Sequence, residues 1–120
     1  MELDYRNILP LLVWNGGRVV ADGTLHLEAG IWTSHVGKMR LLVHPSFRRR
    51  GIGNVLMHEL ITVADELGLH KLVYECAEEQ TSLMGFLRRC DFDEIARLPD
   101  FIQDGTGQRH AMVLLAQQLA

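Results

Sequence analysis

The sequence predicts a mixed β-sheet with helices packed on it, an architecture of the α/β (α+β) class. Apolar runs with strand character alternate with two stretches of helical periodicity. A strand–helix–strand order in the middle of the chain implies a parallel strand pair with a right-handed crossover. Tight turns outside this unit imply antiparallel neighbours. A chain of 120 residues is expected to fold as a single domain, residues 1–120.

The first half of the chain carries three strand signals. An apolar run ends at the turn signal Asn15-Gly16-Gly17, which favours a hairpin. In the next strand, Asp22-Gly23 predicts a bulge or bend, and Pro45 stops the third. The strands expected here are residues 9–14, 18–29 and 36–44, with a loop or strand entry at residues 30–35.

The second half opens with the clearest helix, Gly51–Leu67, whose apolar residues recur at helical spacing and which Gly68 follows. A second helix is expected at residues 78–90, with Glu78 and Glu79 in its first turn and Arg88 and Arg89 in its last. The remaining expectations are strands at residues 71–76, 92–98 and 108–115, and a loop at residues 99–107.

The most informative segment is the basic glycine turn Arg48-x-x-Gly51-x-Gly53, where the long helix begins. Glycines let the backbone approach a ligand closely, and the unpaired amides of a helix start favour a phosphate. The run Arg48-Arg49-Arg50 adds charge and forked donors. These parts suit a diphosphate, whereas the alternative is an ordinary helix entry with a solvated basic run.

In its wider context this segment resembles the GNAT superfamily of N-acetyltransferases. The resemblance rests on the pattern V-x-P-x-x-R-x-x-G-x-G at Val43, Pro45, Arg48, Gly51 and Gly53. It continues through the strand KLVYEC, the helix EEQTSLMGFLRRC with DF after it, and the closing strand RHAMVLL. The resemblance implies a mixed central sheet and acyl transfer from acetyl-coenzyme A (acetyl-CoA) to an amine.

The resemblance also implies which residues bind acetyl-CoA. The strand before the motif would pair with the pantetheine arm as an added strand would, the motif would hold the diphosphate, and a polar residue early in the last helix would touch the cofactor. The residues so implied are Leu42, Val43, Arg48, Arg49, Arg50, Gly51, Ile52, Gly53, Asn54 and Gln80.

Catalytic residues are harder to assign. Many relatives place a tyrosine acid where this chain has Leu87, and a glycine where it has Asp91. The candidates for acid–base chemistry are Glu75 and Tyr74, of which only one can face a site because neighbours on a strand point to opposite sides. Glu28 is a further carboxylate, and each carboxylate has the alternative of lying on a solvated strand face. Cys76 is expected to be a small buried residue.

Composition excludes several other classes. The net charge of −3 argues against nucleic-acid binding through the arginine run, and no apolar run reaches the ~20 residues of a membrane span. Two cysteines without a CxxC spacing indicate a reducing cytoplasm. The six histidines show no metal-ligand spacing, so no metal is expected.

The beginning of the chain departs from the family pattern. Relatives usually start with a strand and two helices that line the acceptor pocket, and we expect these elements to be missing here. This leaves two functions open: an N-acetyltransferase of a small molecule or protein amine, and a non-catalytic acetyl-CoA-binding or regulatory module. Exposed apolar residues such as Trp14, Ile31 and Trp32 predict a homodimer.

Overall fold

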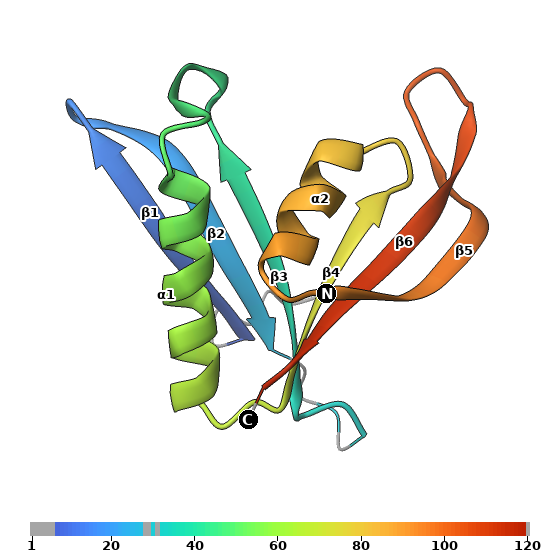
Figure 1. The fold of residues 1–120 in the computed structure, drawn as a ribbon, viewed down its shortest axis with the longest axis horizontal. Coiled ribbons are helices and arrows are strands. Elements are labelled where there is room, and N and C mark those ends of the chain that lie inside the picture. Colours follow the sequence, from blue (N-terminus) through green and yellow to red (C-terminus); the bar gives the residue numbers. More distant parts are fainter. Residues whose placement is uncertain (1–6, 28–29, 31, 120) are drawn as a thin grey trace. The chain divides into compact units, whose positions relative to one another are not determined.

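The computed structural model describes residues 7–27, 30 and 32–119. Its strands belong to one mixed sheet of six strands in the order β1-β2-β3-β4-β6-β5 (Figure 1). The elements along the chain are β1 Ile8–Asn15, β2 Arg18–Leu27, β3 Val36–Val43, a 3₁₀ turn at Pro45–Phe47, α1 Ile52–Glu66, β4 Lys71–Ala77, α2 Thr81–Arg89, β5 Asp93–Gln103 and β6 Arg109–Gln118. The predicted fold class and element order are confirmed.

The residues group into two compact units. The N-terminal unit is Met1–Leu72 with Leu119–Ala120, and the C-terminal unit is Val73–Gln118. No helix in the described part of the chain is long and apolar enough to cross a membrane. That residues 1–120 form a single domain stays a prediction.

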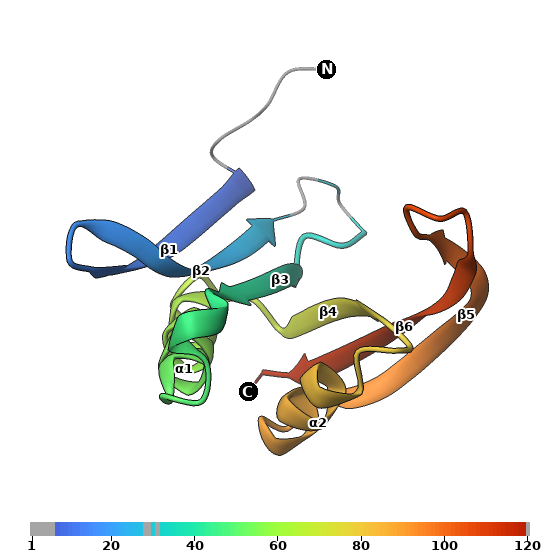
Figure 2. The same cartoon turned by 90° about the horizontal axis from the view of Figure 1, so that it is seen from above.

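In the N-terminal unit, α1 lies along one face of β2 and β3 (Figures 1 and 2). The side chains that meet between them are fully buried, among them Leu25 of β2, Met39 of β3 and Leu60 of α1. The helix ends as expected: Gly68 donates to the Asp65 carbonyl and Leu69 to the Ala64 carbonyl, which satisfies its last carbonyls. Apolar periodicity thus places one face of α1 on the sheet.

The bulge predicted at Asp22-Gly23 lies two residues earlier in β2. Pairing with β1 and β3 is regular at both residues, whereas Val13 and Trp14 of β1 pair with Ala21 and Val19, so Val20 is the extra residue. Gly23 has another role, since a Cβ there would lie 2.8 Å from Leu60 Cδ1. The glycine lets α1 approach the sheet closely.

In the C-terminal unit, α2 begins at Thr81, so Glu78 and Glu79 lie before the helix and not in its first turn. The backbone explains the correction. Glu78 N–H donates to the Ala111 carbonyl of β6, and Gln80 N–H donates to the Ala77 carbonyl, so these residues form a turn attached to β6. Arg88 and Arg89 do lie in the last turn, as predicted.

Strand β5 is longer than predicted, because it continues through Pro99 where a loop was expected. The pairing with β6 shifts register between Leu98 and Ile102, and Asp100 in that interval has a left-handed φ of 52°. The bulge accommodates a proline without ending the strand. Two of the three prolines therefore lie on the outermost strands, Pro10 on β1 and Pro99 on β5.

Candidate functional site

The loop between β3 and α1 has an unusual backbone. Arg49 and Gly51 both have positive φ angles, 64° and 79°, while Arg50 between them does not. Successive residues of opposite hand turn their amide groups toward a common side, which is the geometry of an anion-binding nest. A glycine is favoured at position 51, because a side chain is strained in this conformation.

The start of α1 presents amide donors without competition. Gly51 is the N-cap, no side chain caps the helix, and its first turn contains no acidic residue. The amides of Ile52, Gly53 and Asn54 have no carbonyl four residues back within the helix. A Cβ added to Gly51 would meet no atom within 4 Å, so the space beside it is open. This end of α1 fits the diphosphate that the sequence predicts.

The arginines around this loop have no acidic partner in the described part of the chain. Arg48 Nε donates to the Val43 carbonyl at 3.2 Å. The Arg50 and Arg18 guanidinium carbons lie 5.0 and 5.7 Å from the centre of the Phe47 ring. Among residues 7–27, 30 and 32–119, no carboxylate pairs with any of these three or with Arg49. Positive charge is therefore concentrated beside a helix start that already attracts anions.

Two more predicted cofactor residues end β3. Leu42 is 62% exposed, whereas Val43 is half-buried, as expected for neighbours on opposite faces. On one side, their backbone pairs with Asp22 and Ala21 of β2. Their contact with a pantetheine arm stays a prediction.

The other predicted residues belong to the C-terminal unit. Tyr74 is buried on β4, while its neighbour Glu75 is exposed, which agrees with the expectation that they face opposite sides. Gln80 is also exposed, and its side-chain oxygen accepts a hydrogen bond from Ala77 N–H at 2.8 Å. Of the earlier candidates, Glu28 and Ile31 lie outside the described residues.

The position where relatives carry a tyrosine is part of the core here. Leu87 is a fully buried residue of α2. Asp91, in place of the family's glycine, has a left-handed φ of 70° and follows the helix end, where such a conformation is usual. The amide of Phe92 then returns to the Leu87 carbonyl at 3.0 Å. Asp91 thus adopts the left-handed backbone conformation that a glycine would adopt at this helix end.

The two cysteines are free thiols. Cys76 is buried, as predicted, and burial raises its pKa. Burial also raises the pKa of Cys90. Both sulfurs are therefore protonated at neutral pH and make poor nucleophiles.

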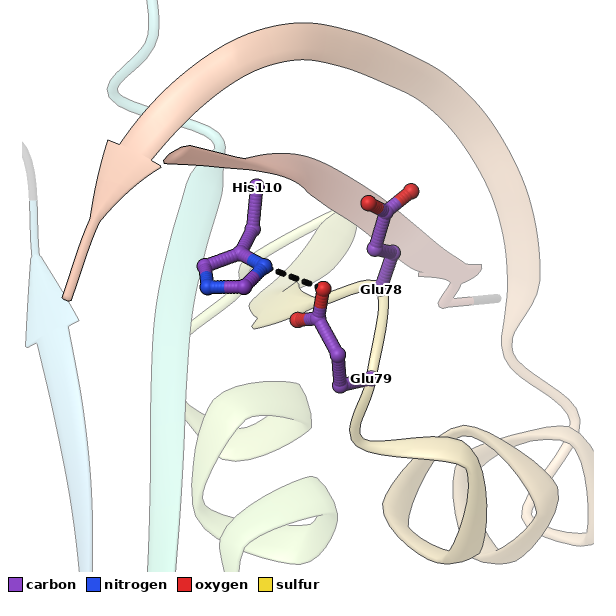
Figure 3. A group of neighbouring side chains, drawn as sticks. All are labelled: Glu78, Glu79 and His110. Atoms are coloured by element: carbon purple, nitrogen blue, oxygen red, sulfur yellow. Dashed lines mark ion pairs between the residues drawn. The ribbon is translucent and has the colours of Figure 1, made fainter. Parts of the chain in front are cut away.

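The sequence analysis missed one group of ionisable residues. His110 of β6 lies between two carboxylates. Its Nδ1 contacts Glu79 (Figure 3), and its Nε2 lies 2.7 Å from Asp104 Oδ2. The hydrogen bond to Asp104 raises the pKa of His110, with Glu79 adding to the effect. The same bond, with help from Thr106, holds the pKa of Asp104 well below its usual range. No local pattern signals this contact, because Glu79 and His110 are far apart in sequence.

The same group is a potential metal site. Glu78, Glu79 and His110 bring three ligand atoms within 4.8 Å of one another. However, both ring nitrogens of His110 already meet carboxylates, and Arg97 Nη1 lies 3.5 Å from Glu78 Oε2. A cation would have to displace the proton and these partners. We interpret the group as an ionic contact that joins β6, the loop before it and the turn before α2.

Comparison with known families decides the identity of the fold. The model of the acetyltransferase (GNAT) family matches residues 2–92, which include the β3–α1 loop and α2. The chain belongs to the acetyltransferase (GNAT) family. The resemblance predicted from the sequence is thereby confirmed, whereas the binding roles predicted for Arg48, Gly51 and Gly53 stay predictions. No curated protein matches the chain in sequence.

Solved structures agree with the GNAT assignment. The ribosomal-protein-alanine N-acetyltransferase from Brucella melitensis is 22% identical, with a TM-score of 0.87 over 95% of this chain and 70% of that one. A GNAT acetyltransferase from Streptococcus pneumoniae is 15% identical, with a TM-score of 0.88 over 94% and 68%. The protein yncA of Salmonella typhimurium, solved with its cofactor acetyl-CoA, is 19% identical, with a TM-score of 0.85 over 92% and 64%. At these identities the likeness establishes the fold, not the substrate.

Proposed function

We propose that this GNAT chain binds acetyl-CoA at the β3–α1 loop and transfers the acetyl group to an amine of a small molecule or protein. One observation carries the proposal: the uncapped start of α1 lies beside arginines that no described carboxylate neutralises. Amide donors and unpaired guanidinium groups together suit a diphosphate. The solved relative with acetyl-CoA supports the choice of ligand.

In this proposal, different residues bind different parts of acetyl-CoA. In the proposal, the amides of residues 51–54 and the side chains of Arg48 and Arg49 hold the diphosphate. The backbone of Leu42 and Val43 pairs with the pantetheine arm, and the Gln80 amide group contributes a further polar contact. Bound acetyl-CoA supplies an activated thioester.

Transfer to an amine requires that the amine lose its proton. Glu75 is the exposed member of the candidate pair and is proposed to accept that proton, directly or through water. The buried Tyr74 is left to position β4. No hydroxyl at position 87 protonates the leaving thiolate, so we expect slow turnover.

A second function, acetyl-CoA binding without catalysis, is favoured by the residue at position 87. Because Leu87 lies in the core where relatives present a hydroxyl, the chain is also suited to bind acetyl-CoA without turnover, as a regulatory module. Both functions need the β3–α1 loop, and only the first needs Glu75. Turnover separates them.

Calorimetric titration tests the binding step. Acetyl-CoA is expected to bind, and pantetheine, which lacks the phosphates, is expected to bind far more weakly. Equal affinity for the two would place the site away from the β3–α1 loop. Thiol release with a panel of amines then tests transfer: loss of activity in Glu75→Gln with unchanged acetyl-CoA affinity would support catalysis, and no release by the wild type would support the regulatory module.

We propose further that the protein is a cytoplasmic homodimer with neither nucleic acid nor membrane among its partners. Its net negative charge and two free thiols support this setting. In the N-terminal unit, Leu12, Trp14 and Trp32 are 50%, 61% and 91% exposed, which supports an apolar contact between copies. A monomeric mass by light scattering at high concentration would contradict the dimer.

A further inference from the structure

Phe47, in the short turn between β3 and α1, is surrounded by basic side chains. Arg50 approaches its ring from the loop and Arg18 from the start of β2, with guanidinium carbons 5.0 and 5.7 Å from the ring centre. The His44 ring meets it edge-on, with centroids 6.1 Å apart. Distant parts of the sequence thus place two guanidinium groups against one aromatic ring, an attractive arrangement that restrains long side chains.

This charge is not balanced within the described residues. No carboxylate there pairs with Arg18 or Arg50, although Arg88 and Arg97 of the C-terminal unit both pair with Glu94. A solvated arginine needs no partner, but two held on one ring beside an uncapped helix start concentrate positive charge. Such a place favours an anion.

The phosphate groups of the proposed ligand indicate which anion these arginines bind. The diphosphate of acetyl-CoA carries two negative charges, for which the α1 amides, Arg48 and Arg49 provide donors. Its ribose carries a separate 3′-phosphate, a monoester with a charge of about −1.5 to −2 at neutral pH. Of the arginines in and beside the β3–α1 loop, Arg18 and Arg50 are the two not assigned to the diphosphate.

We propose that Arg18 and Arg50, supported by Phe47, form a subsite for the 3′-phosphate of acetyl-CoA. The inference rests on the proposed acetyl-CoA binding and adds a specificity to it. The chain selects the 3′-phosphorylated coenzyme over its 3′-dephospho form, and Arg18, which lies outside the GNAT motif, contributes to that selection.

The test is a thermodynamic cycle measured by calorimetry. Wild-type protein and Arg18→Gln are each titrated with acetyl-CoA and with acetyl-3′-dephospho-CoA. Loss of the 3′-phosphate is expected to weaken wild-type binding about tenfold, the scale of a charged hydrogen bond. Arg18→Gln should show most of that loss with acetyl-CoA and little further loss with the dephospho form. Arg89→Gln, an exposed arginine at the end of α2, is the matched control and should behave as wild type.

Each contrary outcome has its own meaning. Equal wild-type affinity for the two coenzymes overturns the subsite and leaves the proposed function standing, whereas no binding of either overturns both. A parallel loss for both ligands in Arg18→Gln reveals a structural role and also overturns the subsite. Inorganic phosphate alone is the last probe: if it saturates the wild type but not Arg18→Gln at millimolar levels, the pair binds free phosphate instead.

Phe47→Leu provides a second variant that preserves apolar packing. It should reduce the affinity ratio between the two coenzymes while leaving the binding of acetyl-3′-dephospho-CoA close to that of the wild type. An unchanged ratio would contradict the supporting role of the ring. Because the readout is a ratio within one protein, partial unfolding does not imitate the expected result.

Discussion

The charged side chains of the two units have different partners. In the C-terminal unit, Arg97 lies 3.0 Å from Glu94 and 3.5 Å from Glu78, and His110 lies between Glu79 and Asp104. In the N-terminal unit, the arginines around the β3–α1 loop contact an aromatic ring and a backbone carbonyl. Charges that pair within the chain contribute to the fold, whereas charges without an internal partner remain available to a ligand.

The largest effect on acetyl-CoA binding is expected from a change at the helix start. Gly51 and Gly107 both have positive φ, 79° and 86°, and a Cβ at either would meet no atom within 4 Å. Valine at either site therefore costs similar strain, about 1–2 kcal/mol. Gly51→Val should weaken acetyl-CoA binding by more than about tenfold, or ~1.4 kcal/mol, and Gly107→Val should not. Calorimetry measures the acetyl-CoA affinity of both variants. Equal affinities in Gly51→Val and Gly107→Val would contradict the difference drawn between the two units.

The next effect concerns stability in the C-terminal unit. Leu87→Tyr restores the family's hydroxyl but places a larger side chain in a fully buried position. We expect the free energy of unfolding to fall by about 1–3 kcal/mol, as overpacking usually costs. Urea denaturation measures this, with Phe86→Tyr at the half-buried neighbouring position as control. Faster thiol release without loss of stability would show that position 87 reaches the ligand.

A third prediction uses pH to test the internal pairing. The carboxylates raise the pKa of His110, so its stabilising effect is complete below its ordinary value of 6.5 and disappears as pH rises through the raised pKa. His110→Gln should therefore lower the melting temperature most in mildly acidic buffer and least in alkaline buffer. His58→Gln, at an exposed site on α1, controls for loss of a histidine. If the difference in melting temperature between His110→Gln and the wild type did not vary with pH, the ionic contact would be contradicted.

The smallest effect compares two residues with left-handed backbones, Arg49 and Asp91. Glycine relieves the strain at either position, so both Arg49→Gly and Asp91→Gly should raise the free energy of unfolding by about 0.5–1 kcal/mol. They should differ in binding, because only Arg49→Gly removes an arginine from the β3–α1 loop. Denaturation and calorimetry on both variants check this. Weaker acetyl-CoA binding by Asp91→Gly would count against the distinction between the units.

Local patterns were sufficient for much of the fold. Helical periodicity located α1 within a residue at each end, and turn residues located the first hairpin. Errors arose where tertiary contacts override local preference. The start of α2 moved to Thr81 because backbone bonds attach the preceding turn to β6, and β5 passed Pro99 because a bulge accommodates it.

The candidate site shows the same division. The pattern at Arg48, Gly51 and Gly53 lies in one short segment, so the sequence alone predicts it, and the family match confirms the family that the pattern indicates. Arg18 reaches Phe47, and Glu79 reaches His110, only because the strands bring distant residues together. Side-chain contacts between separate elements follow from the sheet register, which no single segment of sequence specifies.

The prolines on the outermost strands have a consequence for how copies of the chain meet. An open edge is a template on which another strand adds, and long flat edges lead to aggregation. Pro10 removes an amide from β1, while the bulge at Pro99 interrupts the pairing of β5. Both margins of the sheet are thus protected against growth into fibres. Self-association of this protein is therefore expected to proceed through exposed side chains such as Trp14, and not by extension of the sheet.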